Sequence, residues 1–409
     1  MDTIAALAKE LEKRLPRNLE LLEHLVNTES HAAHHEGVTE VARTIINELS
    51  PLGFAFERTE QSPVPESRRW LEDLLSPGVP YTSLGATYSG TLIGNSPGEL
   101  LVLGDLDTAF PVGTLAQVPF RIVGDTAYGP GIADMKGGLV VLVSALQALH
   151  SLDVAIPSIA LVLSGDEQAG SLGSRPVIER ASENADWCLC VECARRGGKL
   201  MAARGHIGVG RLTVTGVEAH TGSARSQGIN ALEALAQLVL AFNALTAPEA
   251  GTLVTVTIAE SGRRRSIVPA LASATVDIRT KAPKRWTEVT TSLHEIATAV
   301  GQRTGADVEL RTHSHRPGVL WDEGTDRLLA LASSVGHLLS IPVEAFESAA
   351  AGSSAFRRRP IPTLDGLGPI GSGLMTMDEN IDITSIVSRA TLLAGIIRDL
   401  PTALLPEIA

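Results

Sequence analysis

GDLDTAF (residues 104–110) and YGPGIADMKGG (residues 128–138) place Asp105, Asp107 and Asp134 at the ends of hydrophobic segments. The apolar run before Asp105 has the length of a buried strand and stops on a glycine and an acid. The residues after Asp134 predict a helix, with Asp134 at its start, where capping and anionic residues are favoured. In an open α/β sheet, a strand end and a helix start that meet in this way are typical of an active site. A capped helix beside a turn acid is the alternative interpretation.

Length, charge and cysteine content limit the class of protein. The 409 residues are enough for two domains. The formal net charge of −12, without a lysine- or arginine-rich tail, argues against nucleic acid as a partner. No apolar run approaches 18 residues in our interpretation, so we expect no transmembrane span, no signal peptide and no membrane partner. Because Cys188, Cys190 and Cys193 form no disulfide framework, we expect a cytoplasmic protein, with the first two cysteines in its core.

The order of strands and helices predicts two domains of different class. Up to about residue 205, and again after about residue 316, strands alternate with helices, which predicts an α/β domain with a mostly parallel sheet sandwiched by helices. Residues 206–316 have the βαββαβ order of a ferredoxin-like α+β unit. We therefore predict a catalytic domain of residues 1–205 and 317–409, into which residues 206–316 are inserted as a lid. The Pro- and Ser-rich segment 61–84 is interpreted as a surface insertion or flap.

Acidic residues follow several of the predicted strands of the first domain. They are Asp105 with Asp107, Asp134, Asp166 with Glu167, and Glu192. Because the carboxyl ends of parallel strands meet at one edge of a sheet, we expect these side chains to converge. Converging carboxylates need a cation or a shared proton, so a metal site or a coupled acid–base site is predicted. Scattered surface acids are the alternative.

Several motifs resemble, in order and spacing, those of the di-zinc exopeptidases and deacylases. The motifs are GDLDTAF, GPGIADMKGG, SGDEQAGSLGS, VECA and GVEAHTGSARSQGINA. That family includes glutamate carboxypeptidase, acetylornithine deacetylase, succinyl-diaminopimelate desuccinylase and aminoacylase, and glutamate carboxypeptidase is the most similar of the four. The resemblance implies a zinc-exopeptidase-like fold, a lid domain that forms a homodimer, and a metallopeptidase-like hydrolase of C–N acyl bonds.

The resemblance also implies roles for residues of the predicted catalytic domain. In the family a glutamate general base activates a water or hydroxide that bridges two zinc ions. Glu167 corresponds to that base, and Asp134 corresponds to the aspartate that bridges the ions. Glu192 corresponds to a ligand of the first zinc, and Asp107 to the aspartate that orients the first histidine ligand.

Substrate contacts are implied for residues of the lid and of one loop. His220 corresponds to a lid histidine that reaches the substrate carbonyl across the dimer interface. Arg279 corresponds to an arginine that binds the substrate carboxylate, and Arg263 would suit the same anionic group unless it belongs to a solvated turn. Ser353 and Ser354 lie in AAGSSAF, where the family has a glycine-rich substrate loop, so substrate recognition is expected to differ.

Three departures from the family pattern fall on zinc ligands. Asp105 stands in the place of a histidine, Gln168 in the place of the second glutamate of an acid pair, and Leu374 in the place of the distal histidine. The first site then offers only oxygen donors, from Asp105, Asp134 and Glu192, and the second site loses two of three ligands. Oxygen donors favour Mg²⁺ or Mn²⁺ over Zn²⁺. We expect one divalent cation (magnesium, manganese or zinc) or no metal, and not a zinc pair.

These features predict an atypical amide-bond enzyme of the carboxypeptidase and amidohydrolase family. Its substrate is expected to be a small molecule that bears a carboxylate, with Glu167 as acid and base. The retained base beside lost zinc ligands favours a non-hydrolytic step, namely cyclisation, acyl transfer or condensation. An amidohydrolase or carboxypeptidase with one oxygen-ligated metal and a catalytically silent binding protein are the alternatives.

Five further residues have two interpretations each. Cys193, next to an acid, is either a reactive thiol or a small packed residue. His206, at the predicted hinge into the lid, either transfers protons or packs. His31, His34 and His35 either bind a metal or belong to a polar loop.

Overall fold

The computed structural model describes residues 3–281 and 283–404, which form two compact units. The first unit contains Met1–Ala202, Trp321–Glu347 and Phe356–Ala409. The second unit contains Ala203–Leu320 and Ser348–Ala355.

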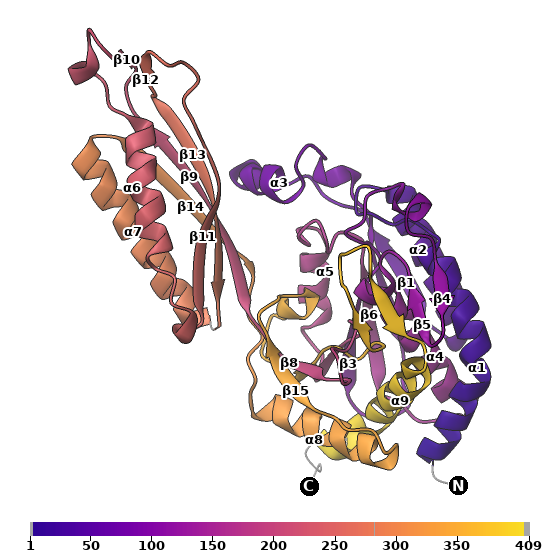
Figure 1. The fold of residues 1–409 in the computed structure, drawn as a ribbon. Helices are drawn as coiled ribbons and strands as arrows, with labels where there is room; N and C mark the ends of the chain where they lie inside the picture. The colour runs from indigo at the N-terminus through magenta and orange to yellow at the C-terminus, as the bar shows by residue number, and fades with distance from the viewer. Residues whose placement is uncertain (1–2, 282, 405–409) are drawn as a thin grey trace. The chain divides into compact units, whose positions relative to one another are not determined.

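A six-stranded sheet of order β1-β2-β6-β3-β7-β16 forms the centre of the first unit (Figure 1). Its strands are β1 (Ala55–Thr59), β2 (Thr87–Leu92), β6 (Ser158–Ser164), β3 (Glu99–Asp105), β7 (Trp187–Cys190) and β16 (Thr363–Leu364). Strands β6, β3, β7 and β16 run parallel to one another, whereas β2 pairs antiparallel with both β6 and β1 at one edge. The predicted mostly parallel α/β sheet is thereby confirmed.

Helices cover both faces of this sheet. They are α1 (Thr3–Val26), α2 (His35–Leu49), α4 (Gly137–Ser151), α5 (Ser174–Ala181), α8 (Glu323–Leu338) and α9 (Ser385–Leu404), whereas α3 (Arg69–Leu75) belongs to segment 61–84. Leu100 and Val102 of β3 belong to the core cluster with α1, α4 and α9, whereas Leu101 and Leu103 belong to the cluster with α5. This alternation is the period of two that a strand buried on both faces requires.

The stretch Ile132–Ser151, which includes α4, is long and apolar enough by length and composition to cross a membrane. The expectation that no apolar run approaches this length was therefore wrong. Its most apolar part is 89% buried inside the first unit. A helix that is apolar all round and enclosed in this way has the environment of a core helix.

Two small sheets complete the first unit. One has the order β17-β18-β5-β4, with β17 (Gly371–Ser372), β18 (Asn380–Asp382), β5 (Thr126–Tyr128) and β4 (Arg121–Val123). The other pairs β15 (Ala345–Ser348) with β8 (Leu200–Arg204). The first of these brings the chain around residue 375 against the chain that leads into Asp134.

The second unit is an antiparallel sheet of order β11-β13-β9-β14 with two helices (Figure 1). Its elements are β9 (His206–Thr215), β10 (Ala219–His220), α6 (Ala231–Asn243), β11 (Thr252–Ser261), β12 (Ile267–Val268), β13 (Leu271–Thr280), α7 (Pro283–Thr304) and β14 (Asp307–Arg316). Leu212 and Val276 of the sheet share one core with Leu235 of α6 and Leu293 of α7. The predicted βαββαβ order and ferredoxin-like class are confirmed.

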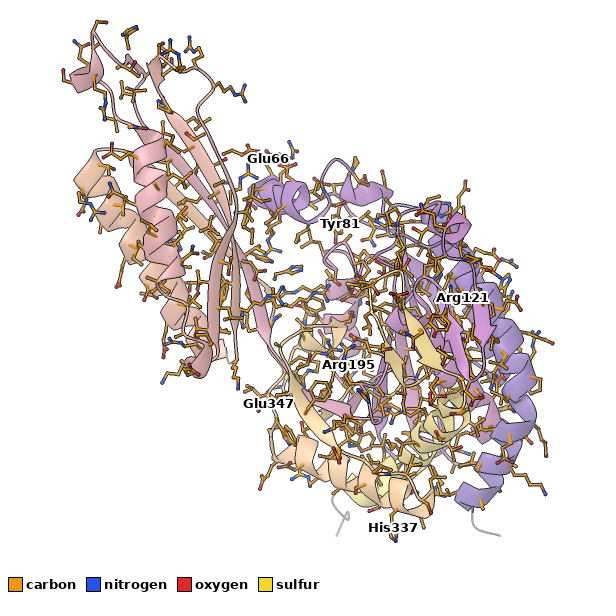
Figure 2. All side chains as sticks on the ribbon, viewed as in Figure 1. Glu66, Tyr81, Arg121, Arg195, His337 and Glu347 are labelled. Atoms are coloured by element: carbon orange, nitrogen blue, oxygen red, sulfur yellow. The ribbon has the colours of Figure 1, made fainter. Side chains whose placement is uncertain are left out.

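Segment 61–84 lies mostly at the surface and is anchored to the first unit through Tyr81. The Tyr81 side chain, labelled in Figure 2, is only 1% exposed. Its hydroxyl donates a hydrogen bond to the carbonyl of Ala169 (3.0 Å) and accepts one from the Leu172 N–H (2.8 Å). The Tyr81 N–H donates to Glu72 (2.6 Å). The segment therefore packs on the loop that follows β6.

Candidate active site

Carboxylates from several strand ends gather around Asp105. Asp105 ends β3 and is 3% exposed. Burial raises its pKa well above the usual range, and the charges of Glu167, Asp107, Glu192 and Asp134 raise it further. Glu167, Asp107 and Glu192 follow the parallel strands β6, β3 and β7, and Asp134 lies in the loop before α4. The structure thus brings together the predicted base, the predicted metal-binding acids and the orienting aspartate.

Asp107 fixes the backbone that carries the predicted base. Its Oδ1 accepts a hydrogen bond from the Glu167 N–H (3.0 Å), and its Oδ2 accepts one from the Gln168 N–H (2.8 Å). Burial and the charges of Glu167 and Asp166 raise the pKa of Asp107, although these two bonds oppose the shift. These two hydrogen bonds position the loop that carries Glu167. The resemblance implies that Asp107 orients a histidine ligand, but Asp105 stands in the place of that histidine in this chain.

Asp134 lies one turn before α4, and it does not cap that helix as predicted. It occupies the π-helical segment Ile132–Lys136, with the non-helical angles φ −122° and ψ 86°. Its Oδ2 accepts a long hydrogen bond (3.5 Å) from the side-chain amide of Gln168. Because Gln168 is neutral, it meets Asp134 as a donor where a second carboxylate would repel it.

Glu379, which the sequence analysis missed, ties together two loops of the site. Its side chain is 1% exposed, and its Oε1 accepts hydrogen bonds from the Ala133 N–H (2.8 Å) and the Asp134 N–H (3.0 Å). Its Oε2 accepts one from the Met375 N–H (3.0 Å). Burial raises the pKa of Glu379, and the backbone donors partly offset the rise. Glu379 therefore holds Asp134 and the loop of Leu374 in place.

A second residue missed in the sequence is the buried cation Lys136. Its Nζ donates to the carbonyl of Thr28 (2.7 Å). Burial lowers the pKa of Lys136 to about 7, while the charges of Glu379 and Glu29 oppose the shift. Lys136 thus places a partly ionised ammonium two residues after Asp134.

Asp166 accepts backbone hydrogen bonds and shapes a loop, although it is adjacent to Glu167 in the sequence. Its Oδ2 accepts hydrogen bonds from the Gly173 N–H (2.9 Å) and the Ser174 N–H (3.3 Å) at the start of α5. Asp166 therefore shapes the loop between β6 and α5, and Glu167 is the acid of the pair that belongs to the group around Asp105.

Two of the positions that the resemblance assigns to zinc ligands carry side chains that are poor zinc donors. Leu374 is half-buried, packs against the main core and has no donor atom. Gln168 offers only a neutral amide in place of a carboxylate. Asp105, Asp134 and Glu192 offer carboxylate oxygens, the donor type that hard cations prefer, and a cation there would offset the like charge around Asp105.

A second possible ligand group involves a cysteine. Among the residues that the structure describes, ligand atoms of Cys190, Glu192 and Asp365 lie within 4.8 Å of one another. Asp365 follows β16, whose parallel register pairs Leu364 with Leu189 of β7. This register brings Asp365 beside Cys190, a juxtaposition that no sequence motif indicates. Cys190 is fully buried, as predicted for a core residue.

The predicted substrate-binding residues of the second unit differ in their surroundings. His220 is exposed, and its Nδ1 accepts hydrogen bonds from the N–H groups of Gly222 (3.1 Å) and Ser223 (3.2 Å). The ring proton therefore lies on Nε2, which is left as a donor. Arg279 of β13 pairs with Asp277 on its own strand (2.9 Å).

Arg263 lies at a groove of the second unit, whereas the two serines are enclosed. The groove has a volume of about 680 Å³ and is also lined by Arg264 and Glu218, which form a salt bridge (3.0 Å). Ser353 and Ser354 are buried in a single 3₁₀ turn.

Two of the further residues have packing roles. Cys193 is buried, and burial raises its pKa to about 12, which contradicts a reactive thiolate. His206 stacks on Trp286 with ring centroids 4.8 Å apart and shares a hydrogen bond with Ser314 (3.0 Å). Burial lowers the pKa of His206 to about 4.

The three histidines of the first loop have separate partners. His34 Nδ1 bonds with the carbonyl of Glu29 (2.8 Å), and His35 lies 3.7 Å from Glu60. His31 Nδ1 accepts the Ala33 N–H (3.2 Å). His31 and His34 lie in the polar loop before α2, and His35 is the first residue of that helix.

Comparison with known proteins identifies the family of this chain. Residues 101–399 match the model of Peptidase family M20/M25/M40. The chain is 30% identical over 392 residues to carboxypeptidase G2 of Pseudomonas sp. (strain RS-16), covering 94% of this chain and 89% of that protein. It is also similar to a tripeptidase structure from Staphylococcus aureus, with a TM-score of 0.77 and 16% identity over 95% of this chain and 98% of that one. A dinuclear metal binding peptidase from Bacillus subtilis matches with a TM-score of 0.69 and 13% identity, over 96% and 99% of the two chains. At these identities the two structures show similarity of fold alone.

Proposed function

The chain belongs to peptidase family M20/M25/M40, and we propose that it is an amide-bond enzyme that works without a pair of zinc ions. We propose a small substrate that bears a carboxylate, with Glu167 as acid and base. The observation that carries this proposal is the hydrogen-bonded support of Glu167 by Asp107, beside positions where zinc ligands are replaced. Glu167 itself is 9% exposed, so its carboxyl lies in a largely water-excluded place.

The proposed reaction transfers the acyl group of an amide. Glu167 takes a proton from the attacking N–H or O–H group and passes it to the amide nitrogen, so the C–N bond breaks as the new acyl bond forms. Following the family resemblance, we propose that His220 polarises the carbonyl oxygen across the dimer interface and that Arg279 and Arg263 bind the carboxylate of the substrate.

The ligand set favours acyl transfer, cyclisation or condensation over hydrolysis. A zinc pair generates hydroxide at neutral pH, and this donor set does not fit such a pair. An amine, or a nucleophile within the substrate itself, is reactive without that activation. Because Glu167 is largely shielded from water, it suits an amine or an internal nucleophile better than it suits water.

One divalent cation gives a second candidate function, an amidohydrolase or carboxypeptidase with oxygen-ligated metal. It is favoured by the raised pKa of Asp105, because a hard cation beside Asp134 and Glu192 would relieve the like charge. The group of Cys190, Glu192 and Asp365 is an alternative place for the ion. When bound, the cation would polarise the amide carbonyl as a Lewis acid.

We also propose that the second unit mediates a homodimer of a cytoplasmic protein. This is supported by large apolar side chains on its surface, among them Leu240 (73% exposed), Leu271 (62%) and Ile258 (53%). Size-exclusion chromatography with light scattering tests the dimer, and a monomer at micromolar concentration would contradict it.

The decisive experiment combines metal content with replacement of the base. Protein purified without chelator is analysed for metals and incubated with N-acyl amino acids, with and without an added amine. Glu167→Gln should abolish product formation, while the matched surface variant Glu12→Gln, at an exposed position of α1, should retain it. Full activity in Glu167→Gln would overturn the base, and two zinc ions per chain would overturn the metal-site proposal. A strict requirement for stoichiometric Mg²⁺ or Mn²⁺ would favour the second candidate.

A further inference from the structure

Segment 61–84 forms one wall of a pocket beside Gln168, and we propose that this pocket receives an apolar acyl group of the substrate. The pocket lies within the first unit and has a volume of about 350 Å³. That is near the lower end for small-molecule sites, which suits one substituent of a ligand. The inference rests on the proposed function, because it names the substrate class of the same site.

The lining of the pocket is mostly aliphatic. Apolar side chains come from segment 61–84 and from the loops that flank the acids, namely Leu75, Pro77, Val79, Leu84, Ala109 and Ala169. Among the described residues that line it, none is Asp, Glu, Lys or Arg. The pocket therefore excludes the carboxylate end of a substrate and favours an uncharged apolar group.

Gln168 links the lining of the pocket to the acid site. Gln168 lines the pocket, and its side-chain amide also donates to Asp134 (3.5 Å). It directly follows Glu167, and Ala109 of the pocket wall lies two residues after Asp107. A substrate whose amide is at Glu167 therefore has this pocket as the adjoining space for its acyl chain.

The wall supplied by segment 61–84 is held in a defined conformation. Ser76 Oγ donates to the carbonyl of Val79 (3.0 Å), which closes the turn between them. Tyr81 and Leu84 are buried in a small core with Ala32 and Ala169. Because Tyr81 is also hydrogen-bonded to the loop after β6, the wall and the base-bearing loop form one packed structure.

His31 gives the pocket one neutral polar contact. Its Nδ1 accepts the Ala33 N–H, so the ring proton is on Nε2. Burial and the neighbouring His34 lower the pKa of His31, which keeps the ring uncharged at neutral pH. A neutral donor is compatible with an aliphatic or aromatic acyl chain and gives no strong attraction for a second carboxylate.

Binding measurements with N-acylglycines of increasing chain length test the pocket. Isothermal titration of Glu167→Gln with acetyl-, butanoyl- and hexanoylglycine measures affinity without turnover. Burial of a methylene is expected to improve affinity about fourfold, so hexanoylglycine should bind on the order of 100-fold more tightly than acetylglycine.

Two variants in the same background test whether segment 61–84 is the wall. Val79→Phe should fill the pocket and bring the affinity for hexanoylglycine down to that for acetylglycine. Leu75→Ala should reduce the gain for each methylene and should serve if Val79→Phe does not fold. Ile93→Ala, at a side chain that is 81% exposed, is the matched control and should bind as the parent does.

The outcomes separate the pocket from the proposed function. Affinity that does not depend on chain length, no binding of any probe, or Val79→Phe binding hexanoylglycine like its parent overturns the pocket. Graded binding without turnover by the protein with Glu167 intact would support the pocket and contradict the amide-bond function. Turnover by that protein, with an affinity that does not depend on chain length, would support the amide-bond function and contradict the pocket.

Discussion

Removing one hydroxyl, in the variant Tyr81→Phe, tests whether segment 61–84 supports the base-bearing loop. The Tyr81 hydroxyl donates to the carbonyl of Ala169 (3.0 Å) and accepts from the Leu172 N–H (2.8 Å). Both partners belong to the loop that follows Glu167. Phenylalanine keeps the ring in place and leaves the two backbone groups without this partner.

The expected loss of stability follows from those two groups. A buried donor or acceptor that loses its partner costs about 1–3 kcal/mol. Because Tyr81 is buried against both groups, we expect Tyr81→Phe to lower the free energy of unfolding by about 2–4 kcal/mol in total. The loop should also become more mobile, so product formation should fall further than the loss of folded protein explains.

Urea denaturation, followed by circular dichroism, measures the change. Tyr128→Phe is the matched control, because Tyr128 is only half-buried and lies beside Arg121, with the guanidinium 4.4 Å from its ring centre. We expect the control to lose less than 1 kcal/mol, within the usual range for surface changes. Equal losses in the two variants would refute the anchoring role of the Tyr81 hydroxyl.

Three other perturbations have expected outcomes. The pKa of His206 is lowered to about 4 in the folded protein, so the unfolded chain takes up a proton at a higher pH than the folded chain does. As the pH falls from 6.5 through 4, about 3 kcal/mol of the stability of the second unit should therefore be lost. His206→Phe should flatten this dependence of the free energy of unfolding on pH. Asp105→His, Gln168→Glu and Leu374→His together should increase zinc content measured by mass spectrometry, and no increase would mean these positions are misaligned. Glu379→Gln should lower the melting temperature, because its carboxylate accepts three backbone N–H groups, and an unchanged value would contradict that role.

The fold could be predicted from the sequence because hydrophobic periodicity and the order of strands and helices are local signals. The apolar run that ends at Asp105 forms β3, and the βαββαβ order of the second unit is visible from hydrophobic periodicity alone. The anchoring of segment 61–84 could not be predicted, for a physical reason. Its prolines and serines are typical of exposed loops, whereas its position depends on a single buried tyrosine, Tyr81, whose partners lie about 90 residues further along the chain.

The candidate site was predictable only where acids follow strands. Glu167 and Glu192 could be placed by that rule, since parallel strands share one edge. Glu379, Lys136 and Asp365 could not, because their positions depend on long-range pairing, such as the parallel register of β16 with β7. An acid before a short strand, as at Glu379, carries no signal of its own.

The charge arrangement of the site explains why lost zinc ligands and a retained base are compatible. Under the proposed function, Asp105 would add a negative group where the family resemblance assigns a neutral histidine ligand. Gln168 removes one negative group, and Lys136 adds a cation whose pKa is near 7. The pKa of Asp105 is nevertheless raised well above its usual range, because burial and four neighbouring acids disfavour its ionised form. The group is therefore completed either by a hard cation or by a proton on Asp105. In the second case the protonated carboxyl can donate a hydrogen bond to a substrate oxygen, which is a role that a histidine bound to zinc could not fill.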